Sequence, residues 1–228
     1  MLRAEVNQAI LDLYESPSYL EIGVFDGNTF NAVRAARKVA VDIAFSCDLE
    51  QERAAVVGQD VHFHECPSDD YFAHVVGDEQ FDVIFIDGLH TFDQTLRDLL
   101  NAIGHLRDGG TIVIDDVLPP SYAASLPSQQ DSNAFRAARG IRKPDWMGDV
   151  YRVIFFLRDY LPAYSFATLI ENHGETVLWK QTRAVDAAPR PVEEISRLSF
   201  ADCQFQRDAF NIRPFGEIVD QLRARRPA

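Results

Sequence analysis

The chain has 228 residues, a formal net charge of -13 and 46% hydrophobic residues. This length and composition suit one α/β domain with appendages. The strong negative charge disfavours nucleic acids and anionic lipid surfaces as partners, because both are polyanions. No segment approaches the roughly 20 consecutive apolar residues that cross a bilayer. Three widely spaced cysteines form no disulfide or zinc pattern, so we expect a cytoplasmic protein. From its charge and its lack of a long apolar segment, we expect neither nucleic-acid nor membrane partners.

Strand-like and helix-like runs alternate along the first half of the sequence. The strand candidates are residues 19–24, 38–44, 60–66, 81–87 and 111–117, and the helix candidates are 29–38, 49–58, 68–77 and 91–106. Residues 107–110, RDGG, are expected to end the last of these helices. This order predicts an α/β fold with a doubly wound, mostly parallel sheet and helices on both faces.

The alternation then breaks. Residues 118–148 contain four prolines and little periodicity, and a segment of that length between core elements is often functional. A helix is expected over 149–162 and a β-hairpin over 164–182, with 172–174 at its turn, which implies an antiparallel edge. We therefore predict a main domain over 1–183, with 118–148 as a substrate loop or lid, and a helical appendage over 184–228.

A glycine-containing turn follows the first strand. Gly23 and Gly27 allow the backbone to bend sharply and to approach a ligand closely. Neither a dinucleotide fingerprint nor a phosphate-binding loop is present. Glu21 and Asp26 add negative charge, so the turn favours a ligand that is neutral or cationic at this point. An ordinary strand-to-helix turn is the alternative.

Acidic residues also follow the second and third strands. Asp42 could accept two hydrogen bonds from the vicinal hydroxyls of a ribose, or could simply end a strand. Ser68, Asp69 and Asp70 open a helix, with Ser68 as the expected N-cap. One of the two aspartates could accept a hydrogen bond from an adenine amino group, although capping alone would also explain them.

A second acidic group follows strands four and five. Asp87 and His90 come just after strand four, and Asp115 and Asp116 end strand five. Carboxylates brought to one edge of a sheet repel each other unless a cation or a proton intervenes. Oxygen ligands suit Mg²⁺, which can lower the pKa of a coordinated hydroxyl. Turn capping by the acids is the alternative. His90 is the candidate base, with Asp87 as the other choice.

Taken together, these motifs resemble class I S-adenosylmethionine-dependent methyltransferases over roughly residues 17–182. The resemblance implies a seven-stranded, Rossmann-like methyltransferase sheet with a reversed last strand. It also implies donor contacts by a set of residues: Glu21, Gly23, Gly27, Asp42, Ser68, Asp69, Asp70 and Asp87. Within that set, Gly23 and Gly27 would face the methionine portion, Asp42 the ribose, and Asp69 or Asp70 the adenine, with Glu21 acting from behind or through water.

Residues 86–117 look closest to small bacterial metal-dependent O-methyltransferases, and Asp87, Asp115 and Asp116 resemble the magnesium ligands of macrolide-sugar enzymes. His90 departs from that pattern. The implied activity is methyl transfer to a hydroxyl of a sugar or natural product, by a protein that could be a homo-oligomer. A nucleotide-dependent oxidoreductase and a non-catalytic ligand-binding protein remain the alternatives. Tyr122, Phe135, Trp146 and Met147 could cover the acceptor, and Asp149 could cap the next helix or contact substrate.

Overall fold

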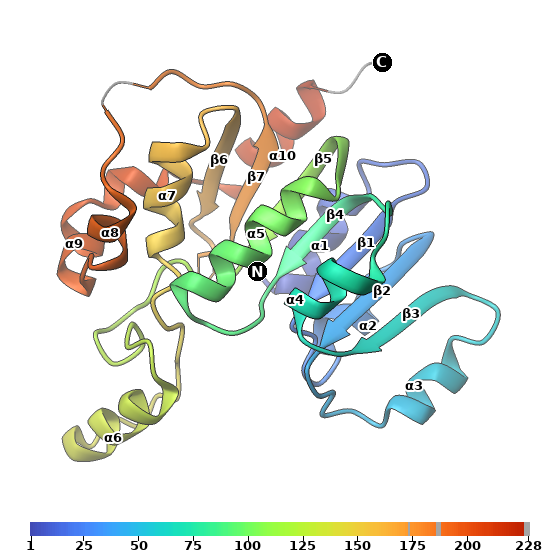
Figure 1. The fold of residues 1–228 in the computed structure, drawn as a ribbon, viewed down its shortest axis with the longest axis horizontal. Coiled ribbons are helices and arrows are strands. Elements are labelled where there is room, and N and C mark those ends of the chain that lie inside the picture. The colour runs from blue at the N-terminus through green and yellow to red at the C-terminus, as the bar shows by residue number, and fades with distance from the viewer. Residues whose placement is uncertain (173, 186–187, 226–228) are drawn as a thin grey trace. The chain divides into compact units, whose positions relative to one another are not determined.

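A computed structural model describes residues 1–172, 174–185 and 188–225 (Figure 1). The elements up to residue 114 are α1 (Arg3–Leu11), β1 (Ser18–Ile22), α2 (Asn28–Ala32), β2 (Arg37–Asp42), α3 (Leu49–Ala55), β3 (Asp60–Glu65), α4 (Ser68–Asp70), the π-helical turn η1 (Tyr71–Val75), β4 (Phe81–Ile86), α5 (Phe92–Gly104) and β5 (Leu106–Ile114). The later elements are α6 (Gln129–Arg139), α7 (Arg152–Tyr160), β6 (Tyr164–Leu169), β7 (Thr176–Lys180), α8 (Val192–Ser196), α9 (Phe200–Phe205), the 3-10 helix η2 (Arg207–Phe210), β8 (Ile212–Arg213) and α10 (Phe215–Ala224).

The described strands follow the order β3-β2-β1-β4-β5-β7-β6-β8. Pairing of β1 with β2 and β4, and of β2 with β3, is parallel, whereas β6 and β7 pair antiparallel. The predicted doubly wound α/β fold and its terminal antiparallel hairpin are confirmed. The predicted number of seven strands is wrong, because the described residues contain eight. The extra strand is the two-residue β8, which pairs in parallel with β6 and is too short to leave a periodic signal.

The chain divides into two compact units. The first comprises residues 1–88, 97–113 and 219–228, and the second comprises 89–96 and 114–218. Positions 173, 186–187 and 226–228 lie outside the described residues, so part of the expected hairpin turn and part of the predicted appendage carry no structural description. The boundary proposed at residue 183 stays a prediction.

The first unit contains β1 to β4, which pair in parallel, and most of β5, and its central strands β1 and β4 are buried. Every residue of β1 is buried, and β4 is buried at all but one position. Such nearly continuous apolar strands are typical of a parallel sheet covered on both faces. Helix α1 contacts β4 and α2, with Val6, Ile10 and Leu11 fully buried. Because the strands run parallel, the turns that leave β1, β2 and β4 lie at one edge of the sheet.

The backbone at Gly23 comes very close to the end of β4. Gly23 has a φ of 85° and donates its N–H to the carbonyl of Val41, while Asp87 donates its N–H to the carbonyl of Ile22. A Cβ atom at residue 23 would lie 2.1 Å from the carbonyl oxygen of Asp87. Glycine is therefore required here both by conformation and by space.

In the second unit, α7 packs against α8 and η2. Phe155 and Phe210 meet edge to face, with ring centroids 5.7 Å apart. The Tyr151 hydroxyl and the Arg152 Nε both donate to the carbonyl of Leu198, each at 2.8 Å. Arg183 Nη2 donates to the carbonyls of Leu157 and Arg158 near the end of α7, which supplies partners to carbonyls that the helix leaves unsatisfied.

Two local expectations differ from the structure. Residues 107–110 were expected to end a helix, but they lie inside β5, where Gly109 has a φ of 82°. The 118–148 segment contains α6, whose N-cap Ser128 accepts a hydrogen bond from the Asp131 N–H and whose C-cap is the left-handed Gly140. Both caps are ordinary helix signals. Among the described residues, no helix has the length and apolar character needed to cross a bilayer.

We expect Gly23→Ala to lower the free energy of unfolding by roughly 2–4 kcal/mol, because the new Cβ adds a steric clash to a left-handed backbone. Gly58 is the matched control, since it has a similar φ of 84° and nothing within 4 Å of an added Cβ. Gly58→Ala should cost only about 1 kcal/mol. Urea denaturation of both variants measures the difference, and equal losses would contradict the argument.

Candidate active site

Asp42 fastens the turn that follows β1. Its Oδ2 accepts the N–H of Phe25 at 2.7 Å, and its Oδ1 accepts the N–H of Ala44 at 3.0 Å. Phe25 has a φ of 50°, which is uncommon for a residue with a side chain. Ser46 in turn donates its N–H to the carbonyl of Phe25. The carboxylate predicted to bind a ribose therefore also holds the turns after β1 and β2 together.

Helix α2 starts at this turn. Gly27 is its N-cap, with a φ of 79°, and Asp26 accepts the N–H of Asn28 at 3.1 Å. Lys38 Nζ donates to the carbonyls of Phe30 and Val33 at the other end of the helix. Burial lowers the pKa of Lys38, and Glu21 opposes this shift when its carboxyl is ionised. A buried lysine thus ends the short helix that opens at the glycine turn.

Glu21 lies beneath this turn and is almost completely buried. The Tyr19 hydroxyl donates to its Oε2 at 2.6 Å. Burial raises the pKa of Glu21 to about 8, partly offset by the Tyr19 hydrogen bond and reinforced by the charge of Asp87. Glu21 consequently holds a proton at neutral pH, which reduces the repulsion from neighbouring carboxylates.

The residues after β3 have structural partners. Pro67, rather than the predicted Ser68, is the N-cap of α4. The Ser68 hydroxyl instead donates to Asp98 Oδ1 at 2.6 Å. Asp69 pairs with Arg97, with 3.2 Å between Asp69 Oδ2 and Arg97 Nε. Asp70, also predicted near the adenine, is exposed. The capping prediction for Ser68 is wrong because the hydroxyl bonds to α5 and not to its own helix.

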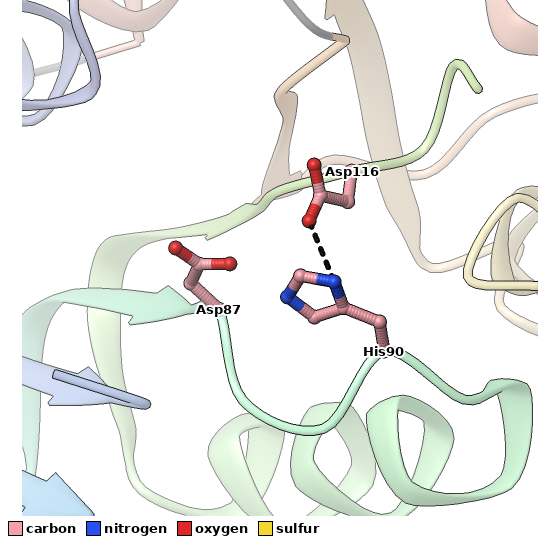
Figure 2. A group of neighbouring side chains, drawn as sticks. All are labelled: Asp87, His90 and Asp116. Atoms are coloured by element: carbon pink, nitrogen blue, oxygen red, sulfur yellow. Dashed lines mark ion pairs between the residues drawn. The ribbon is translucent and has the colours of Figure 1, made fainter. Parts of the chain in front are cut away.

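Asp87, His90 and Asp116 each offer a ligand atom, and these atoms lie within 4.8 Å of one another (Figure 2). Asp87 also approaches Arg3, with 3.6 Å between Asp87 Oδ2 and Arg3 Nε. Asp116 is buried and has a φ of 62°, which places it in the left-handed region where strain is often found at functional sites. Asp115 is buried as well, and its Oδ1 accepts the N–H of Asp116 at 2.8 Å. Asp115 does not belong to this group of three.

The imidazole of His90 has two oxygen neighbours on one ring nitrogen. Nδ1 lies 3.1 Å from Asp116 Oδ2, an ion pair drawn in Figure 2, and 3.0 Å from the carbonyl oxygen of Trp146. A carbonyl oxygen only accepts hydrogen bonds, so Nδ1 carries the proton. In the neutral ring, Nε2 then holds the lone pair. This nitrogen is the one that can accept a proton or bind a cation.

Asp149 was expected to cap the helix over 149–162. In the structure it caps α5, the helix that follows His90. Its Oδ1 accepts the N–H of Phe92, the first residue of α5, at 2.7 Å. Its Oδ2 pairs with Arg152. Asp149 is buried, so these two interactions account for a carboxylate inside the protein.

Sequence reasoning missed Arg3 beside Asp87 and the role of Trp146 beside His90. Arg3 belongs to an N-terminal helix with no recognisable motif, so no local signal indicates its partner. Trp146 and Phe135 were both expected to cover an acceptor. The Trp146 ring stacks on His90 with centroids 4.9 Å apart, and Phe135 contacts Tyr122 edge to face. Their role in covering an acceptor stays a prediction.

Glu21 should make stability depend on pH. The carboxyl has an ordinary pKa of 4.5 and a folded-state pKa of about 8, so the folded state retains a proton that the unfolded state releases. Its contribution is complete below about pH 4.5 and disappears as pH rises through about 8, with a slope of at most about 1.4 kcal/mol per pH unit. Glu21→Gln should remove this slope in urea denaturation between pH 5 and 8. Glu50→Gln, at a highly exposed position, should not, and parallel curves for Glu21→Gln and wild type would refute the assignment.

Comparison with known proteins adds to this geometry. Residues 20–117 match the family model described as a methyltransferase domain, whereas no curated protein matches the sequence. Among solved structures, a Klebsiella pneumoniae protein with a provisional O-methyltransferase assignment is 17% identical, with a TM-score of 0.55 over 80% of this chain and 82% of its own.

Two further structures were determined with a ligand. The O-methyltransferase from Bacillus cereus in complex with SAH is 17% identical, with a TM-score of 0.52 over 77% of this chain and 78% of its own. TomG from Streptomyces achromogenes, an O-methyltransferase involved in tomaymycin synthesis and solved with SAM, is 16% identical, with a TM-score of 0.51 over 78% and 79%. At such low sequence identities, the structural likeness shows a shared fold and nothing more. Residues 20–117 thus resemble a methyltransferase domain, and the chain has the Rossmann-like fold seen in these O-methyltransferase structures.

Proposed function

We propose that this protein transfers the methyl group of S-adenosylmethionine to a hydroxyl group of a small molecule, of sugar or natural-product type. The observation that carries this proposal is the turn after β1, where a close-packed glycine and several carboxylates stand inside a matched methyltransferase domain. Carboxylates favour a donor with a sulfonium and an ammonium group over a pyrophosphate. The structural neighbours solved with SAM or SAH support the same donor.

The proposed donor site uses the edge formed by β1, β2 and β4. Gly23 and Gly27 would let the methionine portion approach the backbone, and Asp42 would accept hydrogen bonds from the ribose hydroxyls. Each Asp42 oxygen already accepts one backbone N–H, and a carboxylate oxygen has capacity for a second donor. Asp69 and Asp70 remain the proposed adenine contacts, with Ser68 and Asp87 completing the set.

In the proposed reaction, His90 accepts the proton of the acceptor hydroxyl at Nε2. The hydroxyl oxygen forms a bond to the methyl carbon as the carbon–sulfur bond breaks, which leaves S-adenosylhomocysteine and a methyl ether. Asp116 stabilises the resulting imidazolium through Nδ1. The protein otherwise holds donor and acceptor in line, which lowers the entropic part of the barrier.

A divalent cation is the second part of the proposal. Asp87, Asp115 and Asp116 are the proposed ligands for Mg²⁺, and the donor atoms of Asp87, His90 and Asp116 lie within 4.8 Å of one another. Carboxylates suit Mg²⁺, and an imidazole nitrogen would also suit Mn²⁺. When bound, such an ion lowers the pKa of a coordinated hydroxyl.

Donor binding provides the first test. We expect calorimetry to detect binding of S-adenosylhomocysteine and none of NAD. Asp42→Asn should weaken the binding at least tenfold, because an amide retains only one acceptor oxygen for the ribose and the turn. Asp78→Asn, which makes the same charge change at an exposed position, should leave it unchanged. Binding of NAD in place of S-adenosylhomocysteine would favour an oxidoreductase.

Loss of the base provides the second test. His90→Gln should lower methyl transfer at least 100-fold while S-adenosylhomocysteine binding stays within about twofold, because the glutamine side chain cannot accept the proton. Transfer is measured with a panel of catechol and methyl-glycoside acceptors. His74→Gln changes an exposed histidine and serves as the control.

The metal is tested separately from turnover. Titration with Mn²⁺, followed by electron paramagnetic resonance, should reveal a bound ion that the Asp87→Asn/Asp116→Asn double variant loses. Full methyl transfer in the presence of a chelator would exclude the cation while leaving His90 as the base. Donor binding without transfer to any acceptor of the panel would favour a non-catalytic binding protein.

A further inference from the structure

We propose that the segment Trp146–Asp149 is a positioning device for His90, which fixes both the tautomer and the orientation of the imidazole. The inference rests on the proposed function in one respect, because it assumes that Nε2 of His90 faces the reacting hydroxyl. Every contact that carries it lies within the second unit. Three separate observations support it, one at each of Trp146, Gly148 and Asp149.

The first observation is the double contact between Trp146 and His90. The carbonyl oxygen of Trp146 accepts from Nδ1 at 3.0 Å, and the indole ring stacks on the imidazole at an interplanar angle of 26°. The indole is itself anchored, since its Nε1–H donates to the carbonyl of Leu126 at 2.7 Å. The stacked ring restricts rotation of the imidazole, and the carbonyl selects the Nδ1–H tautomer.

The second observation is the close approach of two backbones. Gly148 has a φ of 58°, and a Cβ atom at this position would lie 1.6 Å from the carbonyl oxygen of His90. No other residue type fits without displacing the His90 backbone. Because Gly148 lets the two backbones approach so closely, Trp146, two residues before it, can contact the imidazole of His90.

The third observation is that the same segment also fixes the backbone just after His90. Asp149 accepts the N–H of Phe92 and pairs with Arg152. The segment thus contacts the His90 ring through Trp146, passes close to the His90 carbonyl at Gly148, and accepts the Phe92 N–H through Asp149. A loop needed only to connect α6 to α7 would not require all three contacts within residues 90–92.

Asp116 completes the arrangement from another part of the chain. Its Oδ2 lies 3.1 Å from the same Nδ1, so the carboxylate and the Trp146 carbonyl select the same tautomer. The preferred state leaves Nε2 with the lone pair. An imidazole used as a base or as a cation ligand needs this arrangement, as in other sites where a second hydrogen bond fixes a histidine.

The tautomer can be observed without donor or acceptor. Protein labelled with ¹⁵N-histidine should give ring-nitrogen signals of an Nδ1–H tautomer for neutral His90, assigned by their loss in His90→Gln. Gly148→Ala should displace His90 and shift these signals toward a mixture of tautomers. Gly140→Ala is the matched control, because Gly140 also has a positive φ, of 64°, but nothing lies within 4 Å of an added Cβ.

Two pairs of variants keep the test decisive if Gly148→Ala does not fold. Trp146→Ala should shift the His90 signals, and Trp146→Phe, which keeps an aromatic ring over the imidazole, should restore them. Asp149→Ala should shift them as well, and Asp149→Asn, which keeps an acceptor for Phe92, should restore them. Where transfer is measurable, the disruptive variants should lose at least tenfold in rate with S-adenosylhomocysteine binding within about twofold of wild type.

The inference is overturned if wild-type His90 shows the Nε2–H tautomer, or if the disruptive variants leave its signals unchanged. Unchanged signals together with slower transfer would also overturn it, because the segment would then act on something other than His90. Failure of the proposed function gives a different pattern: the His90 signals respond as expected, but no S-adenosylhomocysteine binds.

Discussion

The close packing of Gly23 against the carbonyl of Asp87 is the contact on which the candidate site depends. It joins the turn after β1 to the end of β4 without an intervening side chain, and the hydrogen bonds from Gly23 to Val41 and from Asp87 to Ile22 extend the sheet to the same point. With a side chain at residue 23, the two turns would separate. The backbone surface that a ligand would approach, and the starting position of Asp87, both follow from this contact.

A high density of carboxylates is the electrostatic consequence. Glu21 is buried, and burial raises its pKa to about 8, so it avoids adding a full negative charge. Asp42 is stabilised by two backbone N–H groups, and Asp87 lies near Arg3. Protonation, backbone donors and an arginine thus each reduce part of the repulsion. A cationic donor would reduce it further, which is the physical basis for preferring a sulfonium compound over a phosphate-bearing one.

His90 illustrates how a single side chain acquires a defined chemical state from its surroundings. Its sequence context, three residues after Asp87, leaves the tautomer and direction of the ring open. The Trp146 carbonyl and Asp116 both lie at Nδ1, and the Trp146 indole covers one ring face. These contacts leave the lone pair of the neutral ring on Nε2. They also explain why a 118–148 segment with little periodicity ends in a well-packed aromatic residue and a glycine.

The sequence by itself determined the parallel sheet, the hairpin and the glycine turn, because burial periodicity and glycine conformation are local properties. It also placed Asp87, His90 and Asp116 after the strands that carry them. It did not determine α6 within a proline-containing segment, although Ser128 and Gly140 are local cap signals, nor the two-residue β8, which is too short for any periodicity. Only the tertiary structure decided that Ser68 bonds to Asp98, that Asp149 caps α5, and that Trp146 stacks on His90. Each of these contacts joins residues at least 30 positions apart, and the partner of a polar or aromatic side chain over such a separation depends on how the chain folds back on itself.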